Sequence, residues 1–380
     1  MRIKSLSYSD SRADGWSIDN LSLKNKLNLF IGASGSGKTR VLNILFNIGS
    51  FAARGGPFAN GQWTLHFEHA DIDYTWKYDG DPVGDDQEPQ IFSEELWAGT
   101  PTHVTTSLFF RNETEFRAGE MPVPKLAKNS TAIYLLREEP AIQPVHEAFS
   151  RLLRRRFWSE DLHESVAFQA VPSQLIRKLE KRSVQMSDLG REGLTLHVTL
   201  YIVEKYFPQA YATIVQQFQR VFPFVTDIRI RPASEALNVR ALTSDYPVAL
   251  VKERGIEKPV HLNEIASGMQ KVLLIITDVV TASPQLVYLI DEYENSLGVN
   301  AIDFLPAFLD DCGGERQFII TTHHPLLINT IPVSDWFIFH RKGLRIKVMH
   351  GQEIETRYGR SKQQRFTQLI NDPLYSEGVE

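Results

Sequence analysis

Short apolar segments recur along the chain, and each one ends in small, polar or acidic residues. Leu27–Ile31, Leu286–Ile290 and Gln317–Thr321 are of this kind, and segments of helical periodicity follow or separate them. Continuous apolar runs of about five residues are typical of strands buried on both faces. Strands that alternate with helices at this spacing indicate a parallel sheet, so the pattern predicts an α/β fold.

A second pattern predicts antiparallel hairpins in the same fold. Apolar and polar residues alternate with period two over 63–68 and again over 72–78, which indicates a hairpin with one buried face. Further strands are expected at Ile3–Tyr8 and Val104–Arg111. Four residues of the hairpin could suggest a metal site, but most fall on the polar strand faces or the turn, where a solvated surface is expected: His66, His69, Asp71 and Asp73.

Helical periodicity dominates from Thr131 to about Gln219 and predicts a helical insertion. This insertion contains the strongest charge feature, RLLRRRFW at 151–158, followed by IRKLEKR at 176–182. Arginine and lysine beside aromatic residues suit a phosphate backbone, so DNA contact is one interpretation. The other is the solvated face of a helix.

These patterns divide the chain into four stretches. Residues 1–120 form an N-terminal lobe, 121–222 the helical insertion, 223–350 a C-terminal lobe and 351–380 a polar tail. A meander of strands is expected over 224–255, at the start of the C-terminal lobe. The tail is either a helix that docks on a partner or partly disordered.

Composition excludes several classes of protein. The 380 residues carry a net charge of −5, so the overall charge indicates neither nucleic acid nor an anionic membrane as a partner. A single cysteine, Cys312, excludes an internal disulfide framework and a cysteine-rich zinc site. Neither a signal peptide nor a window of about 20 apolar residues is present, so a cytoplasmic protein without a membrane span is expected.

The strongest motif follows the strand Leu27–Ile31 and precedes a helix expected over 38–50. It matches G-x-x-x-x-G-K-[ST], a loop that binds the phosphates of a nucleoside triphosphate. Lys38 is expected to reach the β- and γ-phosphates, and the Thr39 hydroxyl to ligate Mg²⁺. The nucleotide-binding residues expected here are Gly32, Ala33, Ser34, Gly35, Ser36, Gly37, Lys38, Thr39 and Arg40.

Two later strands end in residues that suit the same site. Asp291 and Glu292 follow Leu286–Ile290, and the ends of parallel strands meet at one edge of a sheet, where the phosphate loop also lies. Asp291 is expected to hold Mg²⁺, and Glu292 to act as the general base for the attacking water. His323 follows Gln317–Thr321 and can hydrogen-bond a γ-phosphate, although a histidine at a strand end is often structural.

Ser267 and Gly268 stand at the start of an apolar helix expected over 263–280. A helix N-terminus with a small hydroxyl residue is a ready anion site. Within one chain it would not complete the phosphate pocket described above. In one known arrangement, such a helix completes the pocket of a second, facing copy.

The order GASGSGKT, ASGMQ, LVYLIDEYEN, TTHHP resembles the ABC-type ATPase superfamily, and within it the RecF/SMC/OLD-like branch. IDE-x-EN and TTH-x-P are typical of OLD-like and related AAA-annotated ATPases of bacterial defence operons. The resemblance covers about 1–115 and 220–345. It implies an ABC-ATPase-type head with a mixed sheet and antiparallel hairpins, plus a variable helical insertion.

Residue by residue, the resemblance implies that Gly32 to Thr39 is the Walker A loop and Asp291–Glu292 the Walker B pair. Ala266 to Gln270 is then the signature segment, Glu294 to Gly298 the D-loop and His323 the switch histidine. In that family two heads enclose two ATP molecules, and the signature serine of one head touches the γ-phosphate on the other, the role of Ser267 here. Met269 and Ala266 depart from the usual signature, so slow turnover is expected.

The resemblance implies a magnesium-dependent ATP hydrolase that dimerises through its heads. Because this chain shows no nuclease, membrane or nucleophile motif, a neighbour-encoded effector such as a nuclease or toxin is expected to supply the output, as in Septu-like or PARIS-like antiviral defence. The alternative is a RecF-like DNA-repair ATPase with DNA on the basic insertion. The Q-loop position stays open among Gln90, Arg111 and Asn112.

Overall fold

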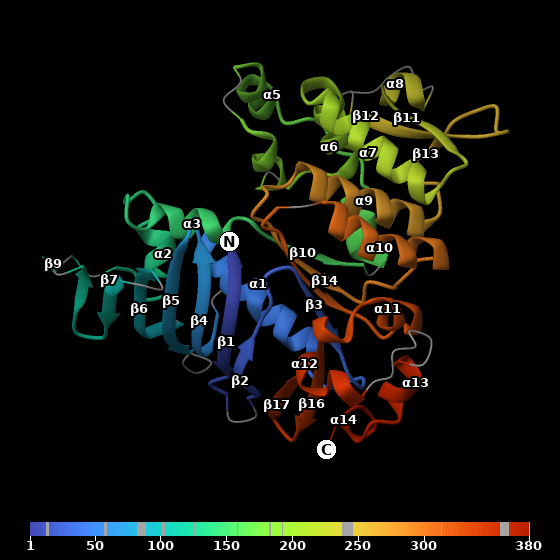
Figure 1. Cartoon of the computed structure of the whole chain (residues 1–380). Coiled ribbons are helices and arrows are strands. Elements are labelled where there is room, and N and C mark those ends of the chain that lie inside the picture. The colour runs from blue at the N-terminus through green and yellow to red at the C-terminus, as the bar shows by residue number, and fades with distance from the viewer. Residues whose placement is uncertain are drawn as a thin grey trace. The chain divides into compact units, whose positions relative to one another are not determined.

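The computed structural model describes residues 1–12, 15–56, 59–81, 89–100, 103–119, 121–122, 124, 126–157, 159–181, 184–191, 193–237, 246–312, 314–357 and 365–379 (Figure 1). Contacts within the chain divide it into two compact units. The first unit comprises 1–154, 285–291 and 314–380, and the second comprises 155–284 and 292–313. These units cut across the four predicted stretches, because the strand that ends at Asp291 belongs to the sheet of the first unit.

Four parallel strands form the part of the first unit's sheet that carries the motifs. They are β14 (Val287–Asp291), β15 (Gln317–Thr321), β3 (Leu27–Ile31) and β16 (Trp336–Lys342), which lie side by side in that order. Every residue of β14 and β15 is buried, as expected for strands covered on both faces. The predicted parallel sheet is therefore confirmed.

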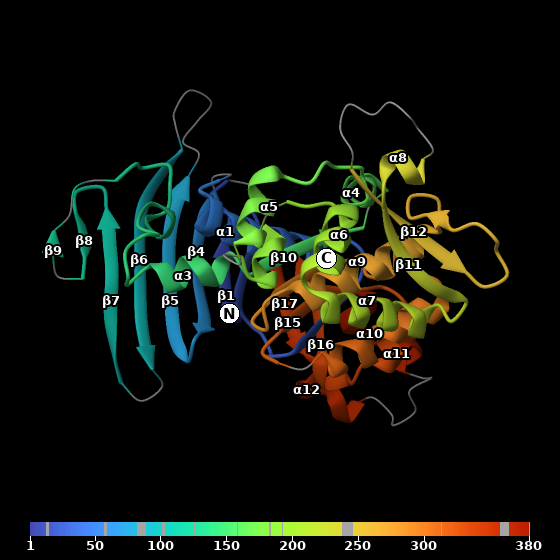
Figure 2. The same cartoon turned by 90° about the horizontal axis from the view of Figure 1, so that it is seen from above.

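The same sheet continues as an antiparallel region, so that 14 described strands share it. The predicted hairpin is confirmed: Trp63 lies opposite Tyr78, and their stacked rings have centroids 3.7 Å apart. Figure 2 shows β4 to β7 as successive neighbours. Sequence patterns missed β2 and β6, since neither shows a clean alternation. The bounds are β1 (Arg2–Ser9), β2 (Ser17–Ser22), β4 (Gly61–His69), β5 (Ile72–Asp81), β6 (Gln90–Thr100), β7 (His103–Asn112), β8 (Phe116–Ala118), β9 (Met121–Pro122) and β17 (Arg345–His350).

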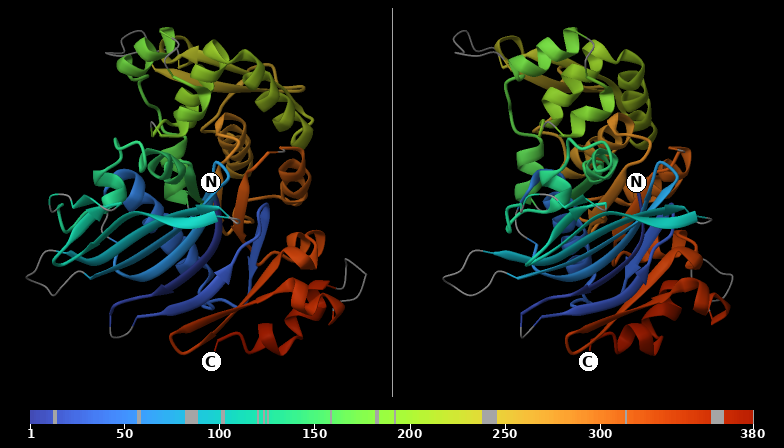
Figure 3. Two further views of the ribbon diagram at one scale, coloured as in Figure 1. Left: turned by 60° about the vertical axis from the view of Figure 1, so that its left-hand side comes forward. Right: turned by 90° about the vertical axis from the view of Figure 1, so that its left-hand side faces the viewer.

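Helix α1 (Lys38–Arg54) follows the phosphate loop and packs into the core of the first unit. It runs past the predicted end at Gly49, which is buried where it faces the Leu152 side chain, and stops at Gly55 in the left-handed region. Figure 3 shows the strands curving beside α1. Helices α2 (Ala132–Leu135) and α3 (Gln143–Phe149) also contact α1.

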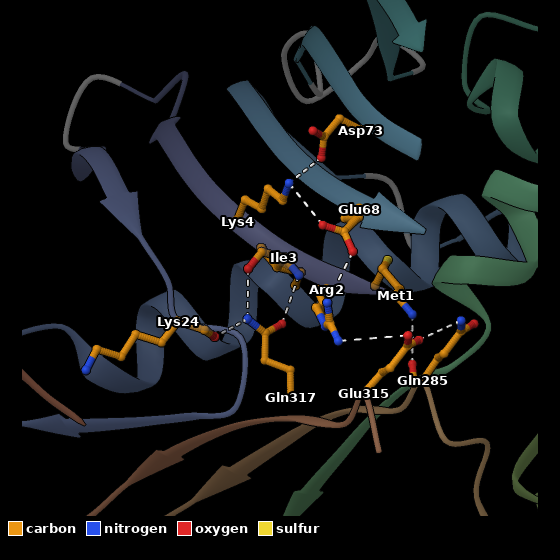
Figure 4. Close-up of polar contacts among 10 residues, drawn as sticks. All are labelled: Met1, Arg2, Ile3, Lys4, Lys24, Glu68, Asp73, Gln285, Glu315 and Gln317. Atoms are coloured by element: carbon orange, nitrogen blue, oxygen red, sulfur yellow. Dashed lines mark hydrogen bonds and ion pairs between the residues drawn. The ribbon is translucent and has the colours of Figure 1, made fainter. Parts of the chain in front are cut away.

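The buried side chain of Gln317 joins three segments of the first unit (Figure 4). Its amide oxygen accepts a hydrogen bond from the Ile3 backbone N–H at 2.8 Å. Its amide nitrogen donates to the backbone carbonyls of Ile3 and Lys24, each at 2.8 Å. The first residue of β15 is thereby fixed to β1 and to the chain that enters β3.

The basic run of the predicted helical insertion is a strand, β10 (Leu152–Arg156), beside β14 at the end of the sheet. The prediction of helix was wrong here because its arginines bind inside the units. Arg151 donates to the Gln285 side chain, and Arg155 forms two hydrogen bonds of 2.8 Å with the Asp278 carboxylate. This run is therefore not a solvated helix face, and DNA contact through the insertion stays a prediction.

The second unit contains helices and a three-stranded sheet in which β11 (Val225–Pro232) pairs with β12 (Pro247–Glu253) and β12 with β13 (Val260–His261). Figure 2 shows α6 and α7 beside this sheet. The expected strand at 236–243 falls largely outside the described residues, as do Trp158 and Arg182 of the basic runs. The helices are α4 (Ser159–Ser165), α5 (Ser173–Glu180), a 3₁₀ turn (Met186–Arg191), α6 (Leu196–Tyr206), α7 (Pro208–Val221), α8 (Ala233–Ala236), α9 (Ser267–Thr281) and α10 (Val299–Asp311).

The predicted polar tail returns to the first unit after 358–364, which lie outside the described residues. Its last part extends the sheet: Gly378 accepts a hydrogen bond of 2.9 Å from the Arg341 N–H, and Val379 bridges Arg341 in parallel. The remaining elements are α11 (Pro325–Thr330), α12 (Gly351–Ile354), 3₁₀ turns at Val333–Asp335 and Glu355–Arg357, α13 (Arg365–Ile370) and α14 (Pro373–Ser376). Of the helices described, none has both the length and the apolar character needed to cross a membrane.

Candidate nucleotide-binding site

The phosphate loop connects β3 to α1, as the motif requires. Gly32 and Gly37 have φ of 146° and 104°, which favour glycine. A Cβ on Gly32 would lie 2.5 Å from the Phe339 carbonyl oxygen, and one on Gly37 would lie 2.3 Å from Ile346 Cδ1. Both glycines are therefore required by backbone conformation and by space.

Lys38 begins α1 and is 6% exposed. Its Nζ donates hydrogen bonds to the carbonyls of Gly32 at 2.8 Å and Ala33 at 3.0 Å. The ammonium group thus lies against the loop that precedes it, within reach of anything the loop binds. The remaining positions differ in access: Ser36 is buried, whereas Ser34, Gly35 and Arg40 are exposed.

Asp291 lies at the end of β14 with 3% exposure, and three side chains meet its carboxylate. Oδ1 accepts hydrogen bonds from Thr39 Oγ1 at 3.1 Å and from Thr321 Oγ1 at 2.8 Å. Oδ2 lies 3.7 Å from Arg154 Nη2. The first unit therefore brings the predicted metal residues Thr39 and Asp291 into contact, and their hydroxyl and carboxylate oxygens are the donors that Mg²⁺ takes.

Arg154 is a member of this cluster that sequence reasoning missed. Its side chain is 3% exposed, donates to Asn43 Oδ1 on α1 and lies over the Phe46 ring. No signal in the sequence marked it, because LLRRR does not alternate apolar and polar residues; only in the structure do buried Leu152 and Arg154 alternate with half-buried Leu153 and Arg155. An arginine on the buried face of a strand requires an anionic partner, which here is Asp291.

Glu292 follows Asp291 but belongs to the second unit, where it opens a tight turn. Its φ is 48°, a left-handed value that costs a residue with a side chain free energy. The Asn295 side-chain amide donates to Glu292 Oε2 at 2.6 Å, and the Asn295 backbone N–H donates to the Glu292 carbonyl at 3.0 Å. The carboxylate of the predicted general base is therefore held by a side chain of its own turn, that of Asn295.

Lys271 of α9 supports the same turn and was also missed. It is fully buried, and its Nζ donates to the carbonyls of Glu292 at 3.4 Å, Asn295 at 2.9 Å and Tyr293. The ammonium also lies 3.9 Å from the centre of the Phe157 ring. Burial lowers the pKa of Lys271 to about 7, while the Glu294 and Glu292 carboxylates oppose this shift.

Ser267 and Gly268 form the first turn of α9, as predicted. Ser267 is exposed, whereas Gly268 packs on the turn that follows Glu292, where a Cβ would lie 2.5 Å from the Ser296 carbonyl oxygen. Gln270, in the predicted signature segment, is buried and donates to the carbonyls of Leu262 and Ile265. Of the predicted signature residues, Ser267 is thus the polar one that α9 presents to solvent.

The two histidines after β15 differ in their surroundings. His324 caps α11, because its Nδ1 accepts a hydrogen bond from the Leu326 N–H at 3.2 Å. His323, the predicted switch residue, is half-buried and belongs to the same unit as the phosphate loop. His324 therefore has a structural role, and His323 stays a prediction.

The Q-loop candidates have partners in the antiparallel region. Arg111 pairs with the fully buried Glu94 at 2.6 Å and donates to two carbonyls. Asn112 Oδ1 accepts from the backbone N–H groups of Thr114 and Glu115. Gln90 pairs with Asp81 at the start of β6. Each contact stabilises a strand or turn, which gives Arg111 and Asn112 structural roles.

Two of the hairpin residues considered for metal binding, His66 and Asp73, are engaged elsewhere. His66 Nδ1 lies 2.9 Å from the Thr75 hydroxyl, and Asp73 pairs with Lys4 (Figure 4). Within the described ranges, no group of three or more His, Cys, Asp or Glu side chains is placed to hold a metal ion.

A protein-family model described as "AAA domain, putative AbiEii toxin, Type IV TA system" matches residues 208–329. This segment contains Ser267, Asp291, Glu292 and His323, while the phosphate loop precedes it. No curated protein matches the chain in sequence.

Among solved structures, an SMC head bound to the C-terminal winged-helix domain of ScpA is similar with a TM-score of 0.50 and 12% identity, over 92% of this chain and 98% of that one. An SMC head of Pyrococcus furiosus with an extended coiled coil, bound to the C-terminal domain of ScpA, has a TM-score of 0.49 and 10% identity, over 94% and 98%. The SMC head of Thermotoga maritima has a TM-score of 0.40 and 11% identity, over 92% and 99%. The predicted fold class, an ABC-ATPase-type head with a mixed sheet, is thus confirmed, and part of the chain matches a family model of an AAA domain.

Proposed function

We propose that this chain binds and hydrolyses ATP, with Mg²⁺ held by Thr39 and Asp291. The observation that carries the proposal is the contact of Thr39 with the buried carboxylate of Asp291 beside a glycine-rich phosphate loop. Lys38 and the N-terminus of α1 supply positive charge to the same place. Bound Mg²⁺ would supply charge neutralisation of the phosphates.

In the proposed reaction, Glu292 accepts a proton from water as the water oxygen forms a bond to the γ-phosphorus. The bond between the γ-phosphorus and the bridging oxygen breaks, and ADP leaves with that oxygen. Lys38 stabilises the charge that develops on the phosphates, and His323 hydrogen-bonds the γ-phosphate. Phosphate and ADP are the products.

We further propose that two copies enclose ATP head to head, with Ser267 of each copy touching the γ-phosphate held by the other. Support comes from the exposure of Ser267 at the start of the 15-residue helix α9. Val299, which opens α10 after the Glu292 turn, is 66% exposed and offers an apolar contact near the same elements.

In this proposal the ATP-dependent dimer controls a neighbour-encoded effector, a nuclease or toxin in antiviral defence. The support is the family description, which names a toxin of a toxin–antitoxin system, and the solved SMC head that carries a bound partner domain. Binding of the effector would depend on whether the ATP-bound dimer is closed. Co-purification of the effector with Glu292→Gln in the presence of ATP, and its loss with Lys38→Ala, tests this step.

Phosphate release by the wild type and by Glu292→Gln is the first test of the enzyme. The wild type should release phosphate only with Mg²⁺. Glu292→Gln should still bind ATP, but its rate of phosphate release should be lower by about 10²- to 10⁴-fold, the range for loss of a general base. Lys38→Ala should lose ATP binding altogether. If the wild type and Glu292→Gln both fail to release phosphate, the assignment as an enzyme is wrong.

Light scattering tests the dimer separately. Glu292→Gln with ATP should run as a dimer at micromolar protein, and Ser267→Arg should return it to a monomer. A Glu292→Gln protein that binds ATP and stays monomeric contradicts the head-to-head arrangement.

DNA binding separates this proposal from the RecF-like alternative. Arg151, Arg154 and Arg155 bind inside the units, so the densest basic run of the insertion is engaged with the chain itself. The exposed basic side chains described there lie on separate elements, among them Arg177 and Lys178 on α5 and Lys205 on α6. Plain duplex DNA should therefore show no salt-dependent binding to the protein alone. Binding that weakens steeply with salt would favour the repair role.

A further inference from the structure

The helix that presents Ser267 and the turn that presents Glu292 are joined by two contacts within the second unit. Gly268 lies against the Ser296 carbonyl so closely that no side chain fits between them. One turn further along α9, Lys271 reaches the carbonyls of Glu292, Tyr293 and Asn295. The turn thus packs on α9 through a glycine and hydrogen-bonds to it through a lysine.

The carbonyls that Lys271 binds point into a buried space and need donors. Lys271 is fully buried and Tyr293 is 1% exposed, so water does not replace the ammonium at this position. A buried carbonyl without a donor is unfavourable, because it loses its hydrogen bonds to water and gains none in the protein. Lys271 is therefore what permits this turn to exist in its observed conformation.

That conformation sets the direction of the Glu292 side chain. Glu292 and Ser296 have φ of 48° and 64°, so both ends of the turn lie in the left-handed region that residues with a side chain avoid. Without its lysine, the turn would relax towards ordinary φ values, and the Glu292 carboxylate would move with its backbone. The Asn295 amide, which holds Glu292 Oε2 at 2.6 Å, belongs to the same turn and would move as well.

We infer that Lys271 is the positioning residue of the ATPase site, which links the helix carrying Ser267 to the turn carrying the general base Glu292. This inference rests on the proposed hydrolysis of ATP. When the γ-phosphate held by a facing copy hydrogen-bonds to Ser267, the first turn of α9 shifts. Lys271, one helical turn further along, then shifts the backbone of the Glu292 turn with it. Binding of ATP by Lys38 and the phosphate loop, in the first unit, does not depend on Lys271.

Lys271→Met is the variant that tests the inference, since it keeps an unbranched side chain of similar length and removes the donor. The control is Lys252→Met, which removes a half-buried lysine of the same unit whose Nζ also binds two carbonyls, those of Ile256 and Glu257. Both variants and the wild type are measured for the ATP dissociation constant and for kcat with Mg²⁺.

The expected result is that Lys271→Met lowers kcat roughly 10- to 100-fold, the cost of a misplaced catalytic group, with an unchanged ATP dissociation constant. Lys252→Met should match the wild type in both. A kcat for Lys271→Met within about twofold of the wild type overturns the inference, and so does a loss of ATP binding that parallels the loss of kcat.

The milder Lys271→Gln, which keeps an N–H donor in the same space, replaces Lys271→Met if that protein does not fold. It should show the same separation of kcat from ATP binding, with a smaller loss, and an unchanged kcat overturns the inference here too. Failure of the proposed function is distinguishable, because the wild type itself would then release no phosphate.

Discussion

Asp291 and Glu292 are neighbours in sequence, yet the protein holds them by different means. Asp291 ends a buried strand, and its side chain is fixed by other side chains: two hydroxyls and an arginine. Glu292 opens a strained turn, in which the Asn295 side chain donates to its carboxylate and Lys271 holds the backbone carbonyls. The proposed metal ligand thus ends a buried strand of the sheet, whereas the proposed base lies in a turn of the second unit.

This difference suits the two tasks. A ligand that must bind Mg²⁺ with every nucleotide benefits from a fixed position. A base that must act only when the site is complete benefits from a position that another element can change. The boundary between the two compact units falls between these two residues, to which the proposed reaction gives Mg²⁺ binding and proton acceptance.

The largest effect on nucleotide binding is expected from Asp291→Asn. Loss of the carboxylate removes the charged Mg²⁺ ligand and leaves the Arg154 cation without its anionic partner. Magnesium-dependent ATP affinity should fall by roughly 100-fold, or about 2.8 kcal/mol, the scale of two charge-assisted contacts. Titration of a fluorescent ATP analogue with and without Mg²⁺ measures it, and an affinity that stays magnesium-dependent would place the metal elsewhere.

Arg154→Met should destabilise the fold by about 3 kcal/mol, because one partner of a buried ion pair is removed. Arg155→Met is the matched control from the same strand. Its side chain is 25% exposed, so loss of its pair with Asp278 should cost about 1 kcal/mol or less. Urea unfolding compares the two, and equal losses would mean that Arg154 has no special role beside Asp291.

The pH dependence of stability tests the environment of Lys271. Because burial lowers the pKa of Lys271 to about 7 from an ordinary value of 10.5, the unfolded chain binds a proton that the folded chain does not over that window. Raising the pH from 7 to 10 should therefore stabilise the wild type relative to Lys271→Met by up to ~1.4 kcal/mol per pH unit. Urea unfolding at pH 7, 8 and 9 measures the difference, and a constant difference would contradict a lowered pKa.

The smallest effect is expected from Thr321→Val. It removes one of the two hydroxyl donors of Asp291 Oδ1 and leaves Thr39 in place. The cost should be about 1 kcal/mol in the free energy of unfolding. Thermal unfolding measures it, and a loss as large as that of Arg154→Met would show that the hydroxyls rather than the ion pair fix Asp291.

Features fixed by local chemistry were predictable from the sequence. The phosphate loop needs glycine at Gly32 and Gly37 for its own backbone, and β14 and β15 are continuous apolar runs that only a buried strand explains. The hairpin at 63–78 shows its pairing in its own period. For these segments the residues and their spacing were enough to place Asp291 beside the loop.

What could not be predicted depends on partners far away in the chain. The arginines of β10 look like a solvated helix face until Asp291 and Asp278 are seen beside them. Lys271 resembles any lysine after a helix start, because the carbonyls that bury it come more than 20 residues later. Gln317 joins β15 to Ile3 across 314 residues. Such contacts leave no periodic pattern, so the supporting residues of the site were missed while its motifs were found.

The contact between Thr39 and Asp291 also limits how early this site can form while the chain is being synthesised. The two residues are separated by 252 positions, which a ribosome takes roughly 10 to 50 seconds to add. During that interval the phosphate loop exists without its metal residue, and β3 lacks the neighbours β15 and β16 that hold it in the sheet. A chain interrupted before Asp291 would therefore never acquire the proposed activity, and ATP could act as a ligand only after the sheet had closed around β3.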